Sequence, residues 1–275
     1  MADQRPEIGN SVLANGIRTN YLEAGDGDPV VLVHGSGPGV SAYANWRQTI
    51  PALSQKLRVY ALDMVGFGFT ARPADIDYNL KTWTDQLIGF LDALGIERAS
   101  LVGNSFGGAI ALRAATQHPD RVNRLALMGS VGVPFSITEG LDAVWGYEPS
   151  AEAMRTIMDY FAYDKELLTD GLAEARFQAS IAPGFHESYS AMFPAPRQRW
   201  VDAMVTPDEA IAALTHETLV VHGREDRVIP LTNSYRLLEL IPRAQLHVFG
   251  QCGHWTQIEK SAVFNELVLN FLTAG

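Results

Sequence analysis

Apolar residues in this chain are grouped in short runs that end at glycine or at a polar residue. Short runs rich in β-branched residues and bounded by glycine are typical of strands in a parallel sheet that is covered on both faces. On this basis we predict strands at residues 30–33, 58–62, 100–103, 124–128, 218–223 and 246–249.

Between these runs the apolar residues recur three or four positions apart, which is the spacing of one helix face. We predict helices at residues 82–94, 105–118, 232–240 and 262–272, the second of which ends before Pro119. Strands that alternate with helices predict an α/β fold in which a doubly wound, mostly parallel sheet carries helices on both faces.

The alternation stops in the second half of the chain. Residues 134–216 hold helical patterns, clearest at 152–161 and 165–181, and Pro/Gly-rich connections, but no convincing strand. We therefore predict a core made of residues 1–133 and 217–275, with residues 134–216 inserted between core strands as a helical cap. A cap at the carboxyl edge of the sheet would cover the crevice in which such folds bind ligands.

Charge and composition narrow the range of partners. The formal net charge is −10, with 31 acidic against 21 basic residues and no run of Lys or Arg, so we expect no nucleic-acid partner. No apolar run approaches the roughly 20 residues that span a bilayer, and the first ten residues lack the pattern of a secretory signal. Cys252 is the only cysteine, which excludes an internal disulfide and fits a cytoplasmic location.

The segment Gly-Asn-Ser-Phe-Gly at residues 103–107 matches the pattern G-x-S-x-G. Because a predicted strand precedes it and a helix follows, we predict a sharp turn that exposes Ser105 as a nucleophile above the sheet. The N-terminus of the helix would also face developing negative charge. A glycine-rich turn with a helix-capping serine would show the same residues.

Among the seven histidines, His254 has the position that a catalytic base requires. It lies in a loop after the last predicted strand and before the last helix, as the hydrolase order of serine, acid and histidine demands. His34 opens the first loop, and we expect it to shape that loop. Structural or solvated roles are expected for His118, His186, His216, His222 and His247.

The acid should follow the strand at 218–223, where Glu225 and Asp226 are adjacent. We favour Asp226, because its spacing places it after the turn and a shorter carboxylate holds imidazole more rigidly. Its role would be to orient His254 and stabilise the protonated ring. A solvated acidic turn paired with neighbouring arginines is the alternative.

Backbone N–H groups for an oxyanion are predicted at Ser36, in the loop HGSGPG after the first strand, and at Phe106, after the nucleophile. The alternative for the loop is a plain glycine-rich turn. It lacks the ending of a phosphate-binding loop.

For Asp63, after a strand, we expect a turn-capping role, and for Cys252 a packing role. The histidines lack the spacing of metal ligands, so we expect no metal and no cofactor.

Taken together, these segments resemble the meta-cleavage-product hydrolases, which cut a carbon–carbon bond in ring-opened catechols. The resemblance spans nearly the whole chain, cap included. The residues that carry it are HGSGPG (34–39), NW (45–46), DMVGFGFT (63–70), GNSFGG (103–108), ITEGLDAVWGY (137–147), PRQRW (196–200), HGREDRVIP (222–230) and CGHWTQIE (252–259).

The resemblance implies hydrolysis of the C5–C6 bond of a dienoate, such as 2-hydroxymuconate semialdehyde, after conversion of the dienol to a ketone. It places Ser105, His254 and Asp226 on the family's catalytic positions and Ser36 and Phe106 on its oxyanion donors. It also implies contacts with the substrate by Gly37, Asn45, Asn104 and Trp255. Both attack by the serine and serine-assisted attack by water are compatible with it, and a homodimer or larger homo-oligomer is expected.

The sequence departs from the family at the cap arginine that binds the carboxylate–keto end of the substrate. An ungapped comparison places Ala182 there, and Arg176, Arg197 or Arg199 could substitute, although surface salt bridges would explain each equally well.

At the other end, we expect Val131, Ile137 and Val144 to line a narrow acyl pocket that prefers hydrogen or methyl to phenyl. Ordinary core packing explains these residues equally well.

Two related activities are the alternatives, namely hydrolysis of the methyl ketone 2-hydroxy-6-oxohepta-2,4-dienoate and general carboxylesterase or perhydrolase chemistry. Dehalogenase and epoxide hydrolase activities are disfavoured because those enzymes use aspartate at the elbow. A non-catalytic receptor on the same fold would not need a base aligned with a serine.

Overall fold

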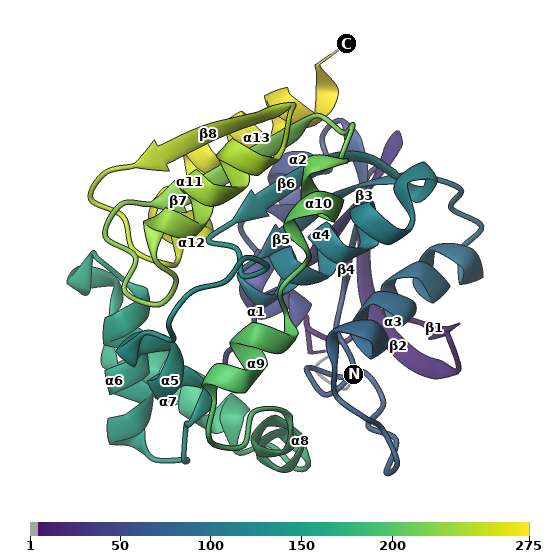
Figure 1. Ribbon diagram of the computed structural model, residues 1–275. Helices are drawn as coiled ribbons and strands as arrows, with labels where there is room; N and C mark the ends of the chain where they lie inside the picture. Colours follow the sequence, from purple (N-terminus) through teal and green to yellow (C-terminus); the bar gives the residue numbers. More distant parts are fainter. Residues whose placement is uncertain (1–4, 275) are drawn as a thin grey trace.

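The computed structural model describes residues 5–274 as an eight-stranded sheet with helices on both faces (Figure 1). The strand order is β1-β2-β4-β3-β5-β6-β7-β8. The strands are β1 (Asn10–Ala14), β2 (Ile17–Ala24), β3 (Asp28–Val33), β4 (Leu57–Leu62), β5 (Ala99–Asn104), β6 (Val122–Met128), β7 (Thr218–Gly223) and β8 (Ala244–Phe249). Residues 1–4 and 275, which the predicted core includes, lie outside the described residues.

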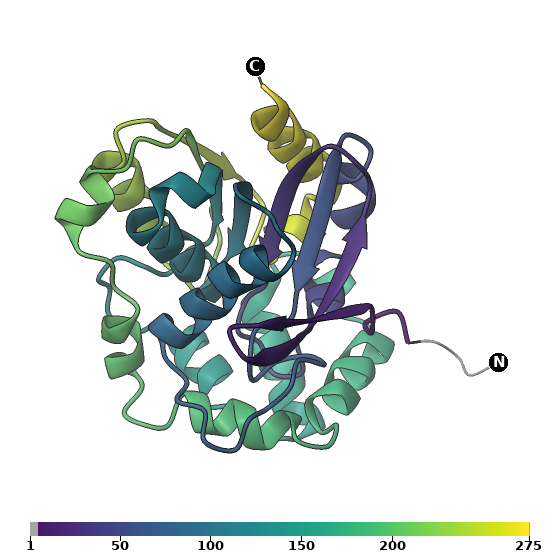
Figure 2. The ribbon, with the colours of Figure 1, turned by 90° about the vertical axis from the view of Figure 1, so that its right-hand side faces the viewer.

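In this order, each pair of neighbouring strands from β4 to β8 is parallel. The β1–β2 pair and the β2–β4 pair are antiparallel. The predicted doubly wound α/β fold is therefore confirmed. The hairpin of β1 and β2 (purple in Figure 2) was not predicted. Its signal was the turn at Asn15-Gly16, where both residues have positive φ, 46° and 79°, as a tight hairpin turn requires.

Two apolar layers cover the sheet. One contains α1 (Ala42–Trp46), α2 (Ile50–Leu53) and α13 (Ser261–Thr273), and the other contains α3 (Leu80–Ala93), α4 (Phe106–Gln117) and α11 (Leu231–Leu240). Buried Val, Leu and Ala side chains of the central strands face both layers, which explains why these strands lack alternation of apolar and polar residues.

The described chain between β6 and β7 contains helices and no strand. They are α5 (Glu139–Trp145), α6 (Ala151–Phe161), α7 (Asp170–Ser180), α8 (Phe185–Met192), α9 (Gln198–Ala203) and α10 (Asp208–Ala212). Figure 1 shows α5 to α9 gathered in the lower part of the view, beyond the sheet. By contrast, α10 packs against α4 and α11.

One predicted cap helix is divided in two. Residues 165–181 form a short 3-10 turn, Lys165–Leu167, followed by α7. The break lies at Thr169, whose side-chain oxygen accepts the N–H of Leu172 at 3.2 Å and so begins a new helix.

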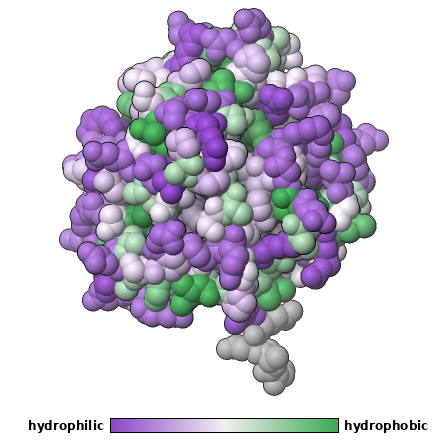
Figure 3. All heavy atoms as spheres, turned by 60° about the horizontal axis from the view of Figure 1, so that its bottom comes forward, coloured by the Kyte–Doolittle hydropathy of each residue, from purple (hydrophilic) through white to green (hydrophobic). Residues whose placement is uncertain are grey.

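The surface on the cap side is mostly hydrophilic, and hydrophobic residues occur there in small separate groups (Figure 3). Among residues 5–274, no helix combines the length and the apolar character that crossing a membrane requires.

Candidate active site

Ser105 lies at a sharp turn between β5 and α4, with φ of 55° and ψ of −114°. A positive φ is costly for a residue with a side chain and persists only where the surroundings enforce it. Here the N–H of Ser105 donates to the carbonyl of Met128 at 2.8 Å, and its carbonyl accepts the N–H of Gly108 at 2.9 Å. A Cβ on Gly103 or Gly107 would overlap backbone atoms, so the packing of the turn requires both glycines of the motif.

The loops after β7 and β8 bring an acid and a base together. His254 Nδ1 lies 2.7 Å from Asp226 Oδ2, and Asp226 Oδ1 accepts the N–H groups of Val228 at 2.8 Å and Ile229 at 2.9 Å. Burial by itself raises the pKa of Asp226, but the charge of His254 and the hydrogen bonds with His222 and His254 hold that pKa below its usual range. The carboxylate can therefore stay ionised and orient the imidazole.

Glu225, the competing acid, points elsewhere. Its carboxylate accepts the N–H of Cys252 at 3.0 Å and pairs with Arg224 at 2.8 Å. The structure thus brings Asp226, and not its neighbour, to His254.

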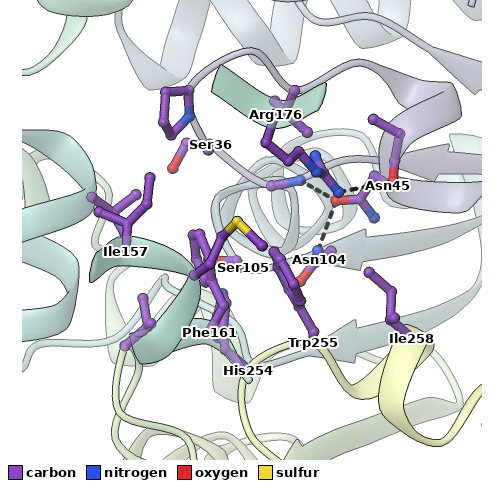
Figure 4. Close-up of a pocket in the computed structure, with 18 of the residues that line it drawn as sticks. Ser36, Asn45, Asn104, Ser105, Ile157, Phe161, Arg176, His254, Trp255 and Ile258 are labelled. Carbon is purple, nitrogen blue, oxygen red and sulfur yellow. Dashed lines mark hydrogen bonds between the residues drawn. The ribbon is translucent and has the colours of Figure 1, made fainter. Parts of the chain in front are cut away.

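Ser105 and His254 line one pocket between the core and the cap, as Figure 4 shows. The glycine-rich loop borders it through Ser36 and Gly37. A Cβ built on Gly35 would lie 3.6 Å from the Cβ of Ser105, so this loop runs directly beside the candidate nucleophile.

Two aromatic residues of the cap hold the loop in place. Trp145 Nε1 donates to Ser36 Oγ at 2.9 Å. The Tyr189 hydroxyl lies 2.9 Å from the Ser36 carbonyl and 2.7 Å from the Val144 carbonyl, so its single hydrogen is shared between the two. Phe106 is the first residue of α4, where backbone N–H groups have no partner within the helix. Its side chain is buried against Trp83, with ring centroids 4.6 Å apart, so only its backbone can serve the site.

One end of the pocket is polar. Asn45 Oδ1 accepts the side-chain amide of Asn104 at 2.9 Å and the N–H of Gly35 at 3.2 Å, drawn as dashed lines in Figure 4. Asn45 Nδ2 and Asn104 Oδ1 are buried without a hydrogen-bond partner among the described residues. Buried polar atoms are normally paired, so Asn45 Nδ2 suits an oxygen atom of a ligand as its donor, and Asn104 Oδ1 suits a ligand hydroxyl as its acceptor.

The cation at this end is Arg176, from α7. Its guanidinium lies 5.5 Å from the ring of Trp255 (Figure 4), and no carboxylate of residues 5–274 forms an ion pair with it. Burial, with a smaller effect of Arg47, lowers the pKa of Arg176 to about 10, so the group is charged at neutral pH. A partly buried, unpaired cation is costly and suits an anionic ligand.

The other anchor candidates lie away from this pocket. Ala182 lines a separate surface hollow, Arg197 pairs with Asp142 at 3.3 Å, and Arg199 lies 4.6 Å from the ring of Trp200. Of the four positions considered, only Arg176, on α7, lines the pocket with Ser105 and His254.

The opposite end, which we call the apolar wall, is formed by side chains of α5, α6 and the loop after β7. They are Leu141, Val144, Met154, Ile157, Met158 and Val228.

Of the three residues expected at this end, Val144 lies on the wall, whereas Val131 and Ile137 do not line the pocket. Val131 is fully buried in the core beside the elbow, where its N–H donates to the Ser105 carbonyl at 3.2 Å. Ile137 precedes α5, and its N–H donates to Gln198 Oε1 at 2.7 Å.

The sequence interpretation missed the contribution of α6. Phe161 stacks on His254 and Trp255, with centroids 5.7 and 5.2 Å apart, and its carbonyl accepts the N–H of His254 at 2.7 Å. The apolar residues 154, 157, 158 and 161 recur at helical spacing. That pattern showed a buried face, but nothing local showed that the face meets His254.

Comparison with known proteins agrees with this geometry. The α/β hydrolase fold family matches residues 28–261. A 2-hydroxymuconate semialdehyde hydrolase of a Pseudomonas species is 62% identical over 267 residues, covering 97% of this chain and 94% of the relative. The structure of a meta-cleavage product hydrolase variant from Pseudomonas fluorescens, complexed with acetates, superposes with a TM-score of 0.96 at 61% identity, covering 96% of this chain and 97% of the other.

The chain belongs to the meta-cleavage product hydrolases of the α/β hydrolase fold family. A third relative, the 2-hydroxy-6-oxo-2,4-heptadienoate hydrolase of Pseudomonas putida, is 60% identical over 274 residues, covering 100% of this chain and 99% of the relative. These relatives differ by name in substrate, and their similarity to this chain is nearly equal.

Two conspicuous polar residues of this hydrolase support loops. His34 lies 2.8 Å from the Gly35 carbonyl through Nδ1 and accepts the N–H of Met64 at 3.0 Å through Nε2, and burial lowers its pKa to about 4. Asp63 accepts the N–H groups of Ala42 at 2.6 Å and of residue 69 at 2.7 Å. Both therefore act as the loop-shaping and turn-capping groups that their positions predicted.

Proposed function

We propose that this enzyme hydrolyses the C5–C6 bond of 2-hydroxymuconate semialdehyde to 2-hydroxypenta-2,4-dienoate and formate. The observation that carries the proposal is the polarity of one pocket. Ser105 and His254 lie between a polar, cationic end and the apolar wall. The substrate has the same polarity, because its carboxylate and C2 oxygen are at one end and its C6 aldehyde is at the other.

Binding would place the carboxylate against Arg176 and the C2 oxygen near Asn45 and Asn104. A charged donor forms stronger hydrogen bonds to a carboxylate than a neutral one. Trp255 and Phe161, which stack with ring centroids 5.2 Å apart and both line the pocket, would flank the planar dienoate. This orientation delivers C6 to Ser105.

Cleavage would follow movement of a proton from the C2 hydroxyl to C5, which leaves a ketone at C2. Ser105 adds to the C6 carbonyl and gives its proton to His254, while the backbone N–H groups of Ser36 and Phe106 stabilise the oxyanion. The C5–C6 bond then breaks, its electron pair passes through C4 and C3 to the C2 oxygen, and this oxygen takes the proton from His254 to give 2-hydroxypenta-2,4-dienoate. Water releases formate from the serine, or water activated by His254 attacks C6 directly; both routes fit this pocket.

Replacing Arg176 by glutamine is expected to lower kcat/KM by roughly 30- to 900-fold, because losing a buried charge–carboxylate contact costs about 2–4 kcal/mol. Steady-state kinetics on the dienoate measure the effect. Arg199→Gln is the matched control, since that arginine is exposed and does not line the pocket. Equal kinetics for the two variants would exclude Arg176 as the anchor.

A second candidate substrate is the methyl ketone 2-hydroxy-6-oxohepta-2,4-dienoate, named for a relative at 60% identity. Loss of dienolate absorbance should be compared for the 6-aldehyde, 6-methyl and 6-phenyl compounds. The aldehyde and methyl compounds should exceed the phenyl compound by at least about tenfold in kcat/KM, because the apolar wall leaves little room beyond C6. Val144→Ala should reduce that ratio by opening the wall.

The same assay separates the carbon–carbon hydrolase from an esterase. If no dienoate is consumed while p-nitrophenyl acetate turns over, the triad assignment survives and the proposed substrate class fails. Fast turnover of the phenyl compound would contradict the narrow pocket alone.

As further parts of the proposal, we expect a homodimer or larger homo-oligomer without nucleic-acid or membrane partners, working in the cytoplasm. The single, buried thiol of Cys252 supports a reducing compartment. Light scattering after size-exclusion chromatography measures the oligomeric state.

A further inference from the structure

The carboxylate of Asp226 is approached by a second histidine. His222, the penultimate residue of β7, is fully buried, and its Nε2 lies 3.3 Å from Asp226 Oδ2 and 3.0 Å from the Ile229 carbonyl. Oδ2 is also the oxygen that binds His254 Nδ1 at 2.7 Å. One carboxylate oxygen therefore lies between two imidazole rings.

The neighbours of His222 determine which ring nitrogen carries the hydrogen. Neither the Ile229 carbonyl nor an ionised carboxylate has a hydrogen to give. Nε2 of His222 must therefore carry the hydrogen that points toward Ile229 and Asp226. A neutral imidazole has one donor and one acceptor. Nδ1 is then the acceptor, and the Ser234 hydroxyl, 2.6 Å away, donates to it. Ser234 thus keeps the N–H of His222 directed at Ile229 and Asp226.

We propose that His222 is a positioning residue of the triad, which acts on His254 through Asp226. Together with the N–H groups on Oδ1, it surrounds the carboxylate with donors and keeps it from rotating. Its N–H dipole also draws electron density from Oδ2, which weakens the hold of Asp226 on the protonated form of His254. The inference rests on the triad of the proposed function, but not on its substrate.

The sign of the pH effect follows from that dipole. Without the His222 N–H, Asp226 would stabilise the protonated form of His254 more strongly. His254 accepts a proton only when it is neutral. The acid limb of the pH–rate profile, which is the fall in activity as the pH is lowered, would therefore lie at higher pH. The Nε2–H of His222 is shared between Ile229 at 3.0 Å and Asp226 at 3.3 Å, so its contact with the carboxylate is weaker than a full hydrogen bond and corresponds to a movement of up to about 0.5 pH unit.

Other titratable groups near His254 stay the same in such a variant. Glu259 of α12 accepts the N–H of Gly253 at 2.8 Å, and burial raises the pKa of the adjacent Cys252 thiol to about 12. Among residues 5–274, neither forms a hydrogen bond or an ion pair with His222. A movement of the acid limb on changing residue 222 is therefore caused by its effect on Asp226.

The test measures the rate at which phenylmethanesulfonyl fluoride labels Ser105, followed by intact mass between pH 5 and pH 9 (roughly the range in which histidine titrates). His222→Leu should slow labelling roughly 10- to 100-fold and move the acid limb upward. His222→Gln, which keeps an amide donor, should restore most of the rate. On the dienoate, His222→Leu should lower kcat and leave KM within about twofold, since residue 222 does not line the pocket.

The matched control is His216→Leu. His216 is also a buried histidine with its Nε2 near a carbonyl, that of Pro119 at 3.0 Å, but it does not contact the triad. The His216→Leu variant should leave the acid limb of the pH–rate profile in place even if its melting temperature falls. If His222→Leu does not fold, Ser234→Ala should still move the limb upward by a smaller amount, because the ring loses the group that fixes its hydrogen.

An unmoved acid limb in the residue 222 and 234 variants, or a slowed rate that glutamine does not rescue, would overturn the inference and leave His222 a packing residue. Labelling needs no dienoate. A wild-type enzyme that is labelled with the expected pH dependence but consumes no dienoate would therefore contradict the proposed function and leave this inference intact.

Discussion

Exchange of Ser105 for alanine is expected to lower kcat on the dienoate by several orders of magnitude, on the order of 10⁶ as for subtilisin. The elbow places this side chain in the pocket beside His254, and no other serine takes its position. His254→Ala should cost about as much, because the two residues act as a unit and their losses do not add. Steady-state kinetics with active-site labelling measure both variants.

Ser100→Ala is the matched control for the serine exchange, because Ser100 is a buried serine of β5, the strand that leads to Ser105, and does not line the pocket. It should retain nearly full activity. Losses below tenfold in both Ser105→Ala and His254→Ala would remove these residues from the catalytic site.

Asp226→Asn should lower kcat by on the order of 10⁴, since an amide cannot hold the histidine in its working tautomer. The structure adds a second reason. Donors approach both carboxylate oxygens, namely the N–H groups of Val228 and Ile229 at Oδ1 and the rings of His254 and His222 at Oδ2. The amide NH₂ therefore meets another donor in either orientation.

Glu225→Gln tests the neighbouring acid. Its oxygen can still accept the N–H of Cys252 after the change to an amide, so kcat should fall by less than about threefold, as expected for a surface change. If Glu225→Gln were the more damaging variant, the acid of the triad would be misassigned. Circular dichroism and thermal melting separate loss of catalysis from loss of folding in both cases.

Features that depend on neighbours in the sequence could be predicted from the sequence. The core strands, the elbow at Ser105 and the His254 loop follow from apolar runs, glycines and their order along the chain. The crowding of Gly103 and Gly107 against the backbone explains why the motif is informative, because no larger residue fits there. The hairpin before residue 25 was missed although its Asn-Gly turn was visible.

Features that depend on distant segments could not be predicted in this way. The spacing in the sequence favoured Asp226 over the adjacent Glu225, but only the packing of the β7 and β8 loops shows that Asp226 is the carboxylate that meets His254. Val131 and Ile137 showed the same apolar character as Val144, yet only Val144 lines the pocket.

The sequence by itself determined the α/β fold and the candidate triad, because short-range sterics and the order of the elements specify them, and its resemblance to the meta-cleavage-product hydrolases indicated the family. Only the tertiary structure decided that Arg176 enters the pocket, that α6 forms much of the apolar wall and stacks Phe161 on His254, and that His222 supports Asp226. The physical reason is that burial and hydrogen-bond geometry depend on which faces of separate helices and loops meet, and periodicity shows that a face is buried without showing its partner.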